Sequence, residues 1–486
     1  MQHQKWTNFQ VLSWVGLLYF AEGLPFGLFF DLFPLWFRSL HLSLVKIGTL
    51  SLLGLAWSMK FLWAPVVDRF SHHRWWIFSA NIIMGACLVF FSFLNHVSAV
   101  SWATLFIYVI CSATNDLAID GITITLSSSN QLGKVNAVRN ISYRIGLIVA
   151  GILLALSNTI GWGKTFVISG IILWLNACLS LAMPNYSYPT KSQQEVTFIQ
   201  ELSILLSTPK ILIGITILIT GLIWPAISKL IPAIQQLEQS SHIYRLLPIF
   251  IICIGLTITS KNITSSSSLQ LGPAFGSLLS LLKKPGILGT IAFILLYRIG
   301  ESASAFMIKP FWMDAGFSRQ EIGLFSVNLG VALSIIGGIV GGWYVDNNST
   351  IRSLWVLGVI PAMANILYGI AAFIALPHIT GIPISTTTRA IVYTASAFDS
   401  FSGGLGSAAF MSYLMKITDK RNATSEYAIL TSIFAFSRSI SGWLGGIGAE
   451  SLGYSTYFFL TFLLCFPAYL FIPYVRKNLG HQNYKS

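Results

Sequence analysis

Ionisable side chains inside long apolar runs are the residues of this sequence that could do chemistry. Asp116 and Asp120 lie four residues apart, so on a helix both carboxyl groups share one face about one turn apart. Two carboxylates that close cannot both stay ionised cheaply in a low dielectric, so one is expected to hold a proton. We predict a proton-coupling site from this pair and Glu22 in the first apolar run. The alternative is that Arg144 or Lys60 neutralises both acids, which then only orient the helices.

Further charged residues in apolar runs indicate a polar cavity between helices, because such groups cost about 3 kcal/mol or more at bilayer depth. Arg144 and Arg438 are candidates for holding an anionic substrate, since a guanidinium binds carboxylate or phosphate through two hydrogen bonds. A hydrogen-bonded anchor between helices explains them equally well. Arg298 and Glu301 are three residues apart and are expected to pair, although a gate broken during transport has the same pattern. The remaining predicted substrate-binding residues are Asn115, Glu301 and Asp399.

The elements that position these residues must lie in a membrane. Of 486 residues, 54% are hydrophobic and 9% are charged, against about 25% charged in soluble domains. This excludes a cytosolic enzyme, a secreted domain and a nucleic-acid-binding protein. The net charge of +13 is typical of the Lys and Arg excess in cytoplasmic loops and does not indicate a polyanionic partner. The five cysteines form no CxxC pair, so we expect no disulfide framework and no metal site.

Apolar runs of about 20 residues predict roughly fourteen membrane helices. Six runs within 10–183 are interpreted as an N-terminal six-helix bundle, and six within 286–475 as a C-terminal one. The linker 184–285 between them contains two less regular runs, 209–231 and 245–260, which predict two extra membrane helices. Long continuous runs exclude a closed barrel, so the predicted fold class is an all-α polytopic membrane protein.

The basic residues in the loops predict the orientation of the chain. With both termini on the cytoplasmic side, about 17 Lys and Arg residues lie in cytoplasmic loops and 7 lie outside. This is the positive-inside pattern. We therefore expect a multi-pass protein with both termini cytoplasmic.

The second half of the chain repeats short motifs of the first half in the same direction. Three motifs recur at offsets near 275–278, namely Pro34-Leu35-Trp36 as Pro310-Phe311-Trp312, Lys46-Ile47-Gly48 as Glu321-Ile322-Gly323, and Val67-Asp68 as Val345-Asp346. A repeat in the same direction requires an even number of spans between the copies, which six helices and the extra pair supply. Two parallel halves of this kind are the plan of the major facilitator superfamily.

The loop after the second apolar run resembles the loop in which that superfamily forms a cytoplasmic latch between helices. It contains Asp68 and Arg69, and the second half has Asp346 at the matching place. The resemblance implies that these residues, with Lys60 just before them, form such a latch. An ordinary solvated loop is the alternative.

More specific segments resemble the AmpG muropeptide permease family, which is also grouped with acetyl-CoA transporters. They are residues 19–25 (YFAEGLP), residues 60–65 (KFLWAP) followed by Asp68-Arg69, residues 112–116 (SATND) with Asp120, and Pro310-Phe311 with Glu321-Ile322-Gly323. Asn115 stands where Gln is expected and Glu22 where Ser is expected. The resemblance implies a proton-coupled major-facilitator importer of the bacterial inner membrane that carries GlcNAc–anhydro-MurNAc peptides. A siderophore importer or an acetyl-CoA-type carrier would share much of this pattern and is the alternative.

Motifs of other protein classes are missing from the sequence. Gly163-Lys164-Thr165 is not a phosphate-binding loop, because Asn158 stands where its first glycine is needed. The sequence contains neither HExxH nor GxSxG. We therefore expect a transporter that works by alternating access, with no enzyme activity and no cofactor. Its expected partners are a small-molecule substrate, a proton and the lipid bilayer, with no nucleic acid and no obligate protein partner.

Overall fold

The computed structural model describes the helical parts of the chain. The described ranges are 8–60, 73–94, 96–126, 132–183, 286–375, 384–418 and 423–483, with Trp63, Val67 and scattered positions between 209 and 258. Every regular element in these ranges is a helix, and eight helices are long and apolar enough to cross a membrane. This confirms the predicted all-α polytopic membrane fold. The predicted extra helices at 209–260 lie almost wholly outside the described residues.

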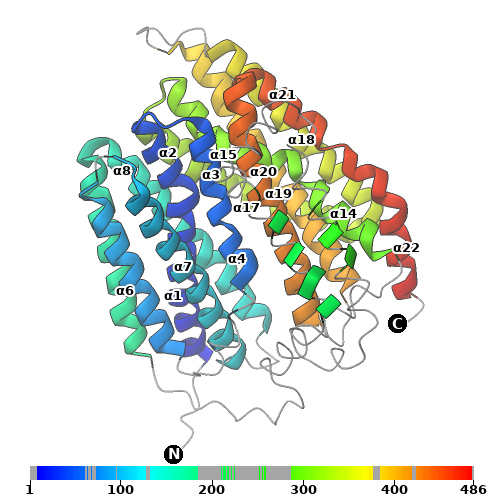
Figure 1. Ribbon diagram of the computed structural model, residues 1–486, viewed down its shortest axis with the longest axis horizontal. Helices are drawn as coiled ribbons and strands as arrows, with labels where there is room; N and C mark the ends of the chain where they lie inside the picture. Colours follow the sequence, from blue (N-terminus) through cyan, green and yellow to red (C-terminus); the bar gives the residue numbers. More distant parts are fainter. Residues whose placement is uncertain are drawn as a thin grey trace, which may run out of the picture. The chain divides into compact units, whose positions relative to one another are not determined.

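The first set of membrane segments occupies the described chain from Asn8 to Leu181. It comprises α1 (Asn8–Gly27) with a π-helical turn (Leu28–Leu32) and α2 (Phe33–Ser39), α3 (Leu44–Leu53) with α4 (Leu55–Met59), α6 (His73–Phe91), α7 (Ala99–Leu126) and α8 (Leu132–Leu181). α8 is two segments joined at Gly161, whose φ of 81° lies in the left-handed region that favours glycine. α1 packs against α7 and α8, and α6 packs against the same two helices (Figure 1).

The second set occupies the described chain from Ile287 to Asn483. It comprises α14 (Ile287–Tyr297) with α15 (Ile299–Asp314), α16 (Arg319–Glu321) with a π-helical stretch (Ile322–Leu329) and α17 (Gly330–Asn347), α18 (Thr350–Ala375), α19 (Thr386–Ile417), α20 (Ala423–Leu452), and α21 (Tyr454–Leu464) with a 3-10 turn (Pro467–Phe471) and α22 (Ile472–Asn483). α19 packs between α17 and α18, and α18 also packs against α21.

The repeated motifs begin equivalent helices after equivalent turns. Ser43 accepts a hydrogen bond from the backbone N–H of Lys46 at the start of α3. Ser318 does the same for Glu321, whose carboxylate accepts from the Ser318 backbone, so α16 starts with a capping box. Each turn has a residue in the left-handed region, His41 with φ 58° and Gly316 with φ 89°. We call the end of the helices at these two turns the distal end, and the opposite end, where α1 begins, the proximal end.

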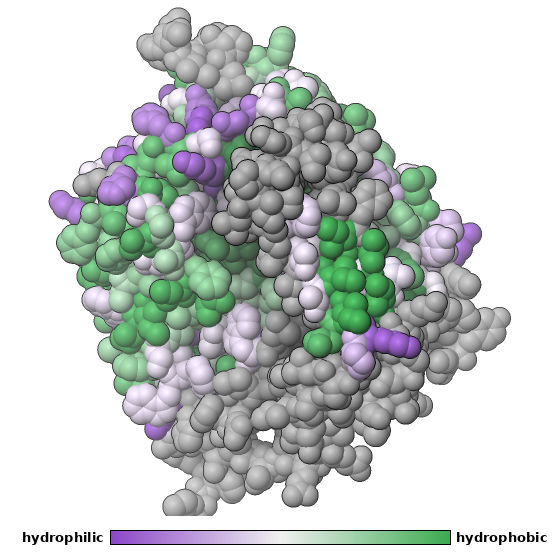
Figure 2. All heavy atoms as spheres, in the orientation of Figure 1, coloured by the Kyte–Doolittle hydropathy of each residue, from purple (hydrophilic) through white to green (hydrophobic). Residues whose placement is uncertain are grey.

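Contacts join the two sets into one compact unit made of residues 1–188, 289–417 and 430–486, while residues 189–288 and 418–429 form a second unit. The predicted bundle limits at 183 and 286 stay a prediction. Apolar side chains cover most of the coloured surface in Figure 2, as a bilayer requires. Inside the first unit the largest buried residues include the repeated Trp36 and Trp312, which are 2% and 0% exposed.

The two sets meet closely at the glycines of the repeated Ile-Gly pair. A Cβ added to Gly48 on α3 would lie 2.8 Å from the Cα of Gly446 on α20. A Cβ added to Gly323 would lie 2.5 Å from the carbonyl oxygen of Gly151 on α8. In a bilayer, where lipid is as apolar as leucine, such close backbone packing holds helices together. We call these two contacts the glycine seams.

Candidate functional site

The predicted proton-coupling aspartates lie in a charged cluster between α1, α4, α7 and α8. Lys60 Nζ lies 3.8 Å from Asp116 Oδ2 and 3.6 Å from Asp120 Oδ2. Asp120 Oδ1 lies 3.0 Å from Arg139 Nη2 and accepts the hydroxyl hydrogen of Tyr19 at 2.7 Å. The guanidinium of Arg139 also stacks 4.6 Å from the centroid of the Tyr19 ring. Lys60 is thus near both acids, and the second cation is Arg139.

Glu22 belongs to the same cluster. It lies one turn beyond Tyr19 on α1 and interacts electrostatically with Asp116, Asp120 and Lys60. Its Oε2 atom is buried and has no hydrogen-bond partner among the described residues, and the same holds for Asp116 Oδ1. Among the residues that the structure describes, the cluster therefore holds three carboxyl groups, Glu22, Asp116 and Asp120, against the two cations Lys60 and Arg139. Fully ionised, it would carry one net negative charge, and a single proton would neutralise it.

Tyr19 and Arg139 are members of the cluster that the sequence did not single out. Tyr19 stands three residues before Glu22 in the segment that resembles the permease family, so helical spacing could have placed both on one face. Arg139 has the sequence pattern of a basic residue in a cytoplasmic loop, and nothing in the sequence distinguishes it from the other loop cations. Only the path of α8 brings it to Asp120.

Asn115, a predicted substrate-binding residue, has its amide engaged between helices. Its Oδ1 accepts from Asn81 Nδ2 at 3.0 Å, and its Nδ2 donates to the carbonyl oxygen of Ala21 at 3.2 Å. Asn115 is fully buried. It therefore joins α7 to α6 and α1 in this structure, and its contact with substrate stays a prediction.

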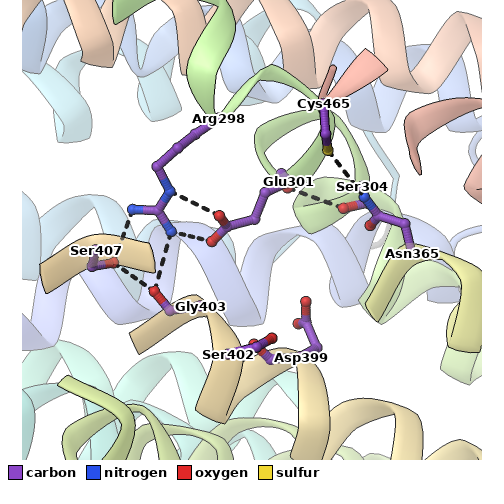
Figure 3. A network of polar contacts seen from close by, with 9 residues as sticks. All are labelled: Arg298, Glu301, Ser304, Asn365, Asp399, Ser402, Gly403, Ser407 and Cys465. Atoms are coloured by element: carbon purple, nitrogen blue, oxygen red, sulfur yellow. Dashed lines mark hydrogen bonds and ion pairs between the residues drawn. The ribbon is translucent and has the colours of Figure 1, made fainter. Parts of the chain in front are cut away.

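The second set contains a separate polar network, shown in Figure 3. Arg298 Nε donates to Glu301 Oε2 at 2.8 Å, Nη2 donates to Glu301 Oε1, and Nη1 donates to Ser407 Oγ at 2.8 Å. The structure thus contains the Arg298–Glu301 pair that the spacing predicts. Asp399 lies on α19, the helix that also contributes Gly403 and Ser407 (Figure 3). A small pocket beside the pair is lined by Tyr297, Arg298, Glu301, Gly358, Pro361, Ala362, Gly406 and Cys465.

The two predicted anion-binding arginines have different surroundings. Arg144 Nη1 donates to Ser334 Oγ of α17 at 2.7 Å, so it links the two sets of helices. Arg438 on α20 lies over two rings of the first segment, 4.3 Å from the centroid of Phe30 and 5.6 Å from that of Phe26. Within the described part of the chain, Arg438 has no ion pair and no hydrogen bond.

Charged side chains also join the two sets near the distal end. Arg38 Nε and Nη2 donate to the two oxygens of Asp314, each at 2.6 Å, and Tyr454 donates its hydroxyl hydrogen to Asp314 Oδ2 at 2.6 Å. One to two turns deeper, Lys309 Nζ lies 2.9 Å from Asp31 Oδ1. We call these five residues the distal clasp. No local sequence pattern at Arg38 or Lys309 indicates these partners.

The predicted latch is only partly described. Asp68 and Arg69 lie outside the described residues, and Asp346 is an exposed residue at the proximal end of α17. Lys60, the fourth predicted latch residue, lies in the charged cluster with Asp116 and Asp120. The latch therefore stays a prediction.

These features define a multi-pass membrane protein with two packed sets of helices and charged groups in the interior of each set. The Major Facilitator Superfamily model matches residues 15–296, more than half of the chain, and the chain belongs to this superfamily. The predicted major-facilitator fold is thereby confirmed. A solved structure of a POT family transporter in complex with 5-aminolevulinic acid has the same fold, with a TM-score of 0.69 at 13% identity, covering 98% of both chains.

Named relatives confirm the resemblance to the AmpG permease family. The chain is 22% identical over 477 residues to the anhydromuropeptide permease of Escherichia coli strain K12, covering 96% of this chain and 79% of that protein. It is 23% identical over 487 residues to a putative transporter, AmpG 3, of Rickettsia typhi, covering 97% of both. These relatives are named as a permease and a transporter, and not as enzymes.

Proposed function

We propose that the chain imports anhydro-muropeptides, GlcNAc–anhydro-MurNAc peptides, together with protons across the bacterial inner membrane by alternating access. The observation that carries this proposal is the similarity to the Escherichia coli anhydromuropeptide permease over 96% of the chain. The charged interior supports it, because acids that can take up a proton lie in the same unit as arginines that suit an anionic substrate. Its partners are this substrate, the proton and the surrounding lipid.

The charge count of the cluster supports proton coupling. Three carboxyl groups face two cations, and an excess charge at membrane depth is costly. A neutral carboxyl group needs fewer hydrogen bonds than a carboxylate, which suits the unpartnered oxygens of Glu22 and Asp116. One proton per cluster thus removes the net charge, and its release restores it. Coupling follows if the neutral and charged clusters favour different arrangements of the two sets of helices.

The contacts between the sets support a distal-closed state. The distal clasp and both glycine seams hold the distal halves of the helices together. At the proximal side the cluster is partly open, since the side chains of Asp120 and Arg139 are 30% and 41% exposed. We propose that the proximal end faces the cytoplasm, with both termini there, and that import requires the clasp to open toward the periplasm. Arg144, Glu301, Asp399 and Asn115 are proposed to line the substrate path.

The experiment that tests this function measures uptake of labelled anhydro-muropeptide in bacterial cells that lack their own permease. We expect accumulation above the external concentration that collapses when a protonophore is added. Accumulation unaffected by the protonophore would contradict proton coupling and leave the substrate standing. Lack of uptake, with the protein demonstrated in the membrane, would contradict the proposed substrate.

Proton coupling is tested separately by Asp120→Asn. This variant removes the carboxylate that contacts Lys60, Arg139 and Tyr19, so it should abolish accumulation and leave substrate exchange in the absence of a gradient. Glu450→Gln is the matched control, because it removes the charge of an exposed carboxyl group outside the cluster and keeps an oxygen that can accept from the backbone N–H of Leu44. It should keep protonophore-sensitive accumulation. Uphill uptake by Asp120→Asn at the rate of the unmodified protein would overturn the role of the cluster.

A further inference from the structure

Pro25 interrupts α1 between its two groups of charged residues. Proline has no N–H group, so the carbonyl oxygen of Ala21, four residues earlier, lacks its usual helical donor. Glu22 of the charged cluster stands before this break, and Asp31 and Arg38 of the distal clasp stand after it in the same membrane span. A movement that passes along α1 from the cluster to the clasp must therefore cross the break.

Two side chains of α7 donate hydrogen bonds to the backbone of α1 at the break. Asn115 Nδ2 donates to the carbonyl oxygen of Ala21 at 3.2 Å, in place of the N–H group that Pro25 lacks. The Tyr108 hydroxyl donates to the carbonyl oxygen of Pro25 at 3.0 Å. Tyr108 and Asn115 are seven residues apart, so they share one face of α7, which packs against α1 (Figure 1). We call these two hydrogen bonds the α7 bridge.

The α7 bridge is buried and fixed by further contacts. Tyr108 and Asn115 are both fully buried. Asn81 of α6 donates to Asn115 Oδ1 at 3.0 Å, which sets the end of the amide that faces α1. α8 holds the same turn, because a Cβ added to Gly146 would lie 2.6 Å from the backbone nitrogen of Leu24. The break in α1 is therefore held closely by both neighbouring helices.

The bridge also starts beside the acids of the charged cluster. Asn115 precedes Asp116 on α7, and Ala21 precedes Glu22 on α1. A change in the charge of the cluster alters the force between the two helices at this level. The bridge applies that force to α1 at the turn where a backbone hydrogen bond is missing and where a helix bends most easily.

We propose that Asn115, with Tyr108, is a positioning residue that couples protonation of the charged cluster to opening of the distal clasp. The clasp is the element with two states, and the α7 bridge makes its α1 side follow the movement of α7. This inference rests on the proposed function and deepens it, because it names the contacts through which the proton acts on the distal end. It does not require Asn115 to touch the substrate.

The test measures distal opening of the purified full chain in lipid nanodiscs, without substrate. Spin labels at Lys46→Cys on α3 and Gln320→Cys on α16, in a background whose native cysteines are replaced, report the distance across the distal end. Asp120→Asn mimics protonation of the cluster and should change the ratio of open to closed populations by about fivefold or more. We call this change the response. With Asn115→Leu, which removes the donor, the response should fall below about twofold.

Two further variants separate coupling from folding. Tyr108→Phe keeps the ring and loses only the hydroxyl group, so it should reduce the response even if Asn115→Leu does not fold. Asn176→Leu is the matched control, because it removes another buried amide, on α8, and it should leave the response at its full size. A full response in both bridge variants would overturn the inference. An equal loss in Asn176→Leu would do the same.

Pro25→Ala tests whether Asn115 acts on the break in α1. Alanine restores an N–H group that can donate to the carbonyl oxygen of Ala21. The loss of melting temperature caused by Asn115→Leu should therefore be at least about twofold smaller in the Pro25→Ala background. Equal losses in the two backgrounds would show that Asn115 does not replace the missing donor, and would overturn the inference.

The outcomes distinguish this inference from the proposed function. A response that persists at full size without the α7 bridge would refute the inference and leave proton coupling by the cluster standing. An unchanged distance distribution on Asp120→Asn in the otherwise unmodified protein would refute proton coupling by the cluster, and the inference with it. Because the test uses no muropeptide, neither result depends on the proposed substrate.

Discussion

Asp314→Asn tests the distal clasp, because Asp314 is the acceptor that three separate donors share. Two come from Arg38 and one from the hydroxyl of Tyr454, all at 2.6 Å. The side chains of Arg38 and Asp314 are 25% and 17% exposed, so solvent screens them only partly. Hydrogen bonds to a charged group contribute about 1.5–3 kcal/mol, and asparagine retains one acceptor. We therefore expect the distal-closed state to lose about 2 kcal/mol relative to the open state, which is about 30-fold in the equilibrium.

The population of the open state can be measured by electron paramagnetic resonance distances between spin labels. Lys46→Cys on α3 and Gln320→Cys on α16 place labels at exposed positions near the distal end of the two sets, in a background whose native cysteines are replaced. Asp314→Asn should shift the distance distribution toward longer values. Tyr454→Phe removes one donor only, so its shift should correspond to about 1 kcal/mol.

The exchanged pair Arg38→Asp with Asp314→Arg is the control for charge pairing. It restores an ion pair with reversed partners and should bring the distances back toward those of the unmodified protein. An unchanged distribution in Asp314→Asn would refute the clasp. So would an exchanged pair that is as open as the single variant.

Three further predictions concern packing and pairing. Gly48→Ala places a Cβ 2.8 Å from Gly446 Cα and should lower the free energy of unfolding of the purified protein by about 1–3 kcal/mol. The control is Gly338→Ala, whose new Cβ has nothing within 4 Å and should not change this free energy. Equal effects of the two substitutions would contradict the seam. Arg298→Met leaves Glu301, whose side chain is 24% exposed, without its ion pair. It should lower the free energy of unfolding by about 2 kcal/mol, less than for a fully buried pair, and adding Glu301→Leu should recover most of the loss. A double variant no more stable than the single one would contradict the pairing. Tyr19→Phe removes one of two donors to Asp120 Oδ1 and should reduce proton-driven uptake about fivefold at unchanged expression. Unchanged uptake would exclude Tyr19 from the proton-coupling mechanism.

The part of the site that the sequence predicts is the part governed by the cost of membrane charges. Asp116, Asp120, Glu22 and Lys60 stand out because each lies in or beside an apolar run, and such groups must meet one another in the bundle interior. Arg298 and Glu301 could be paired from their spacing alone. In each case the residue type and its position along the sequence are enough to predict the contact.

The rest depends on contacts between distant segments. Arg38 and Asp314 are 276 residues apart and each looks like an ordinary charge at a helix end. Arg139 has the signature of a loop cation, since positive residues in loops set topology whatever else they contact. Such pairs become visible only when helix packing brings the two sets together, which no local periodicity specifies.

The two glycine seams share one pattern. In each, a glycine of the repeated Ile-Gly pair meets two small residues four apart, Gly442 and Gly446 for Gly48, and Gly151 and Ala155 for Gly323. Either half of the chain thus presents both the glycine and the small pair that receives it, as subunits do in a two-fold symmetric dimer. At these two seams the halves meet backbone against backbone, so the seams can slide or part while the side chains of the distal clasp carry the contacts that must be broken and remade.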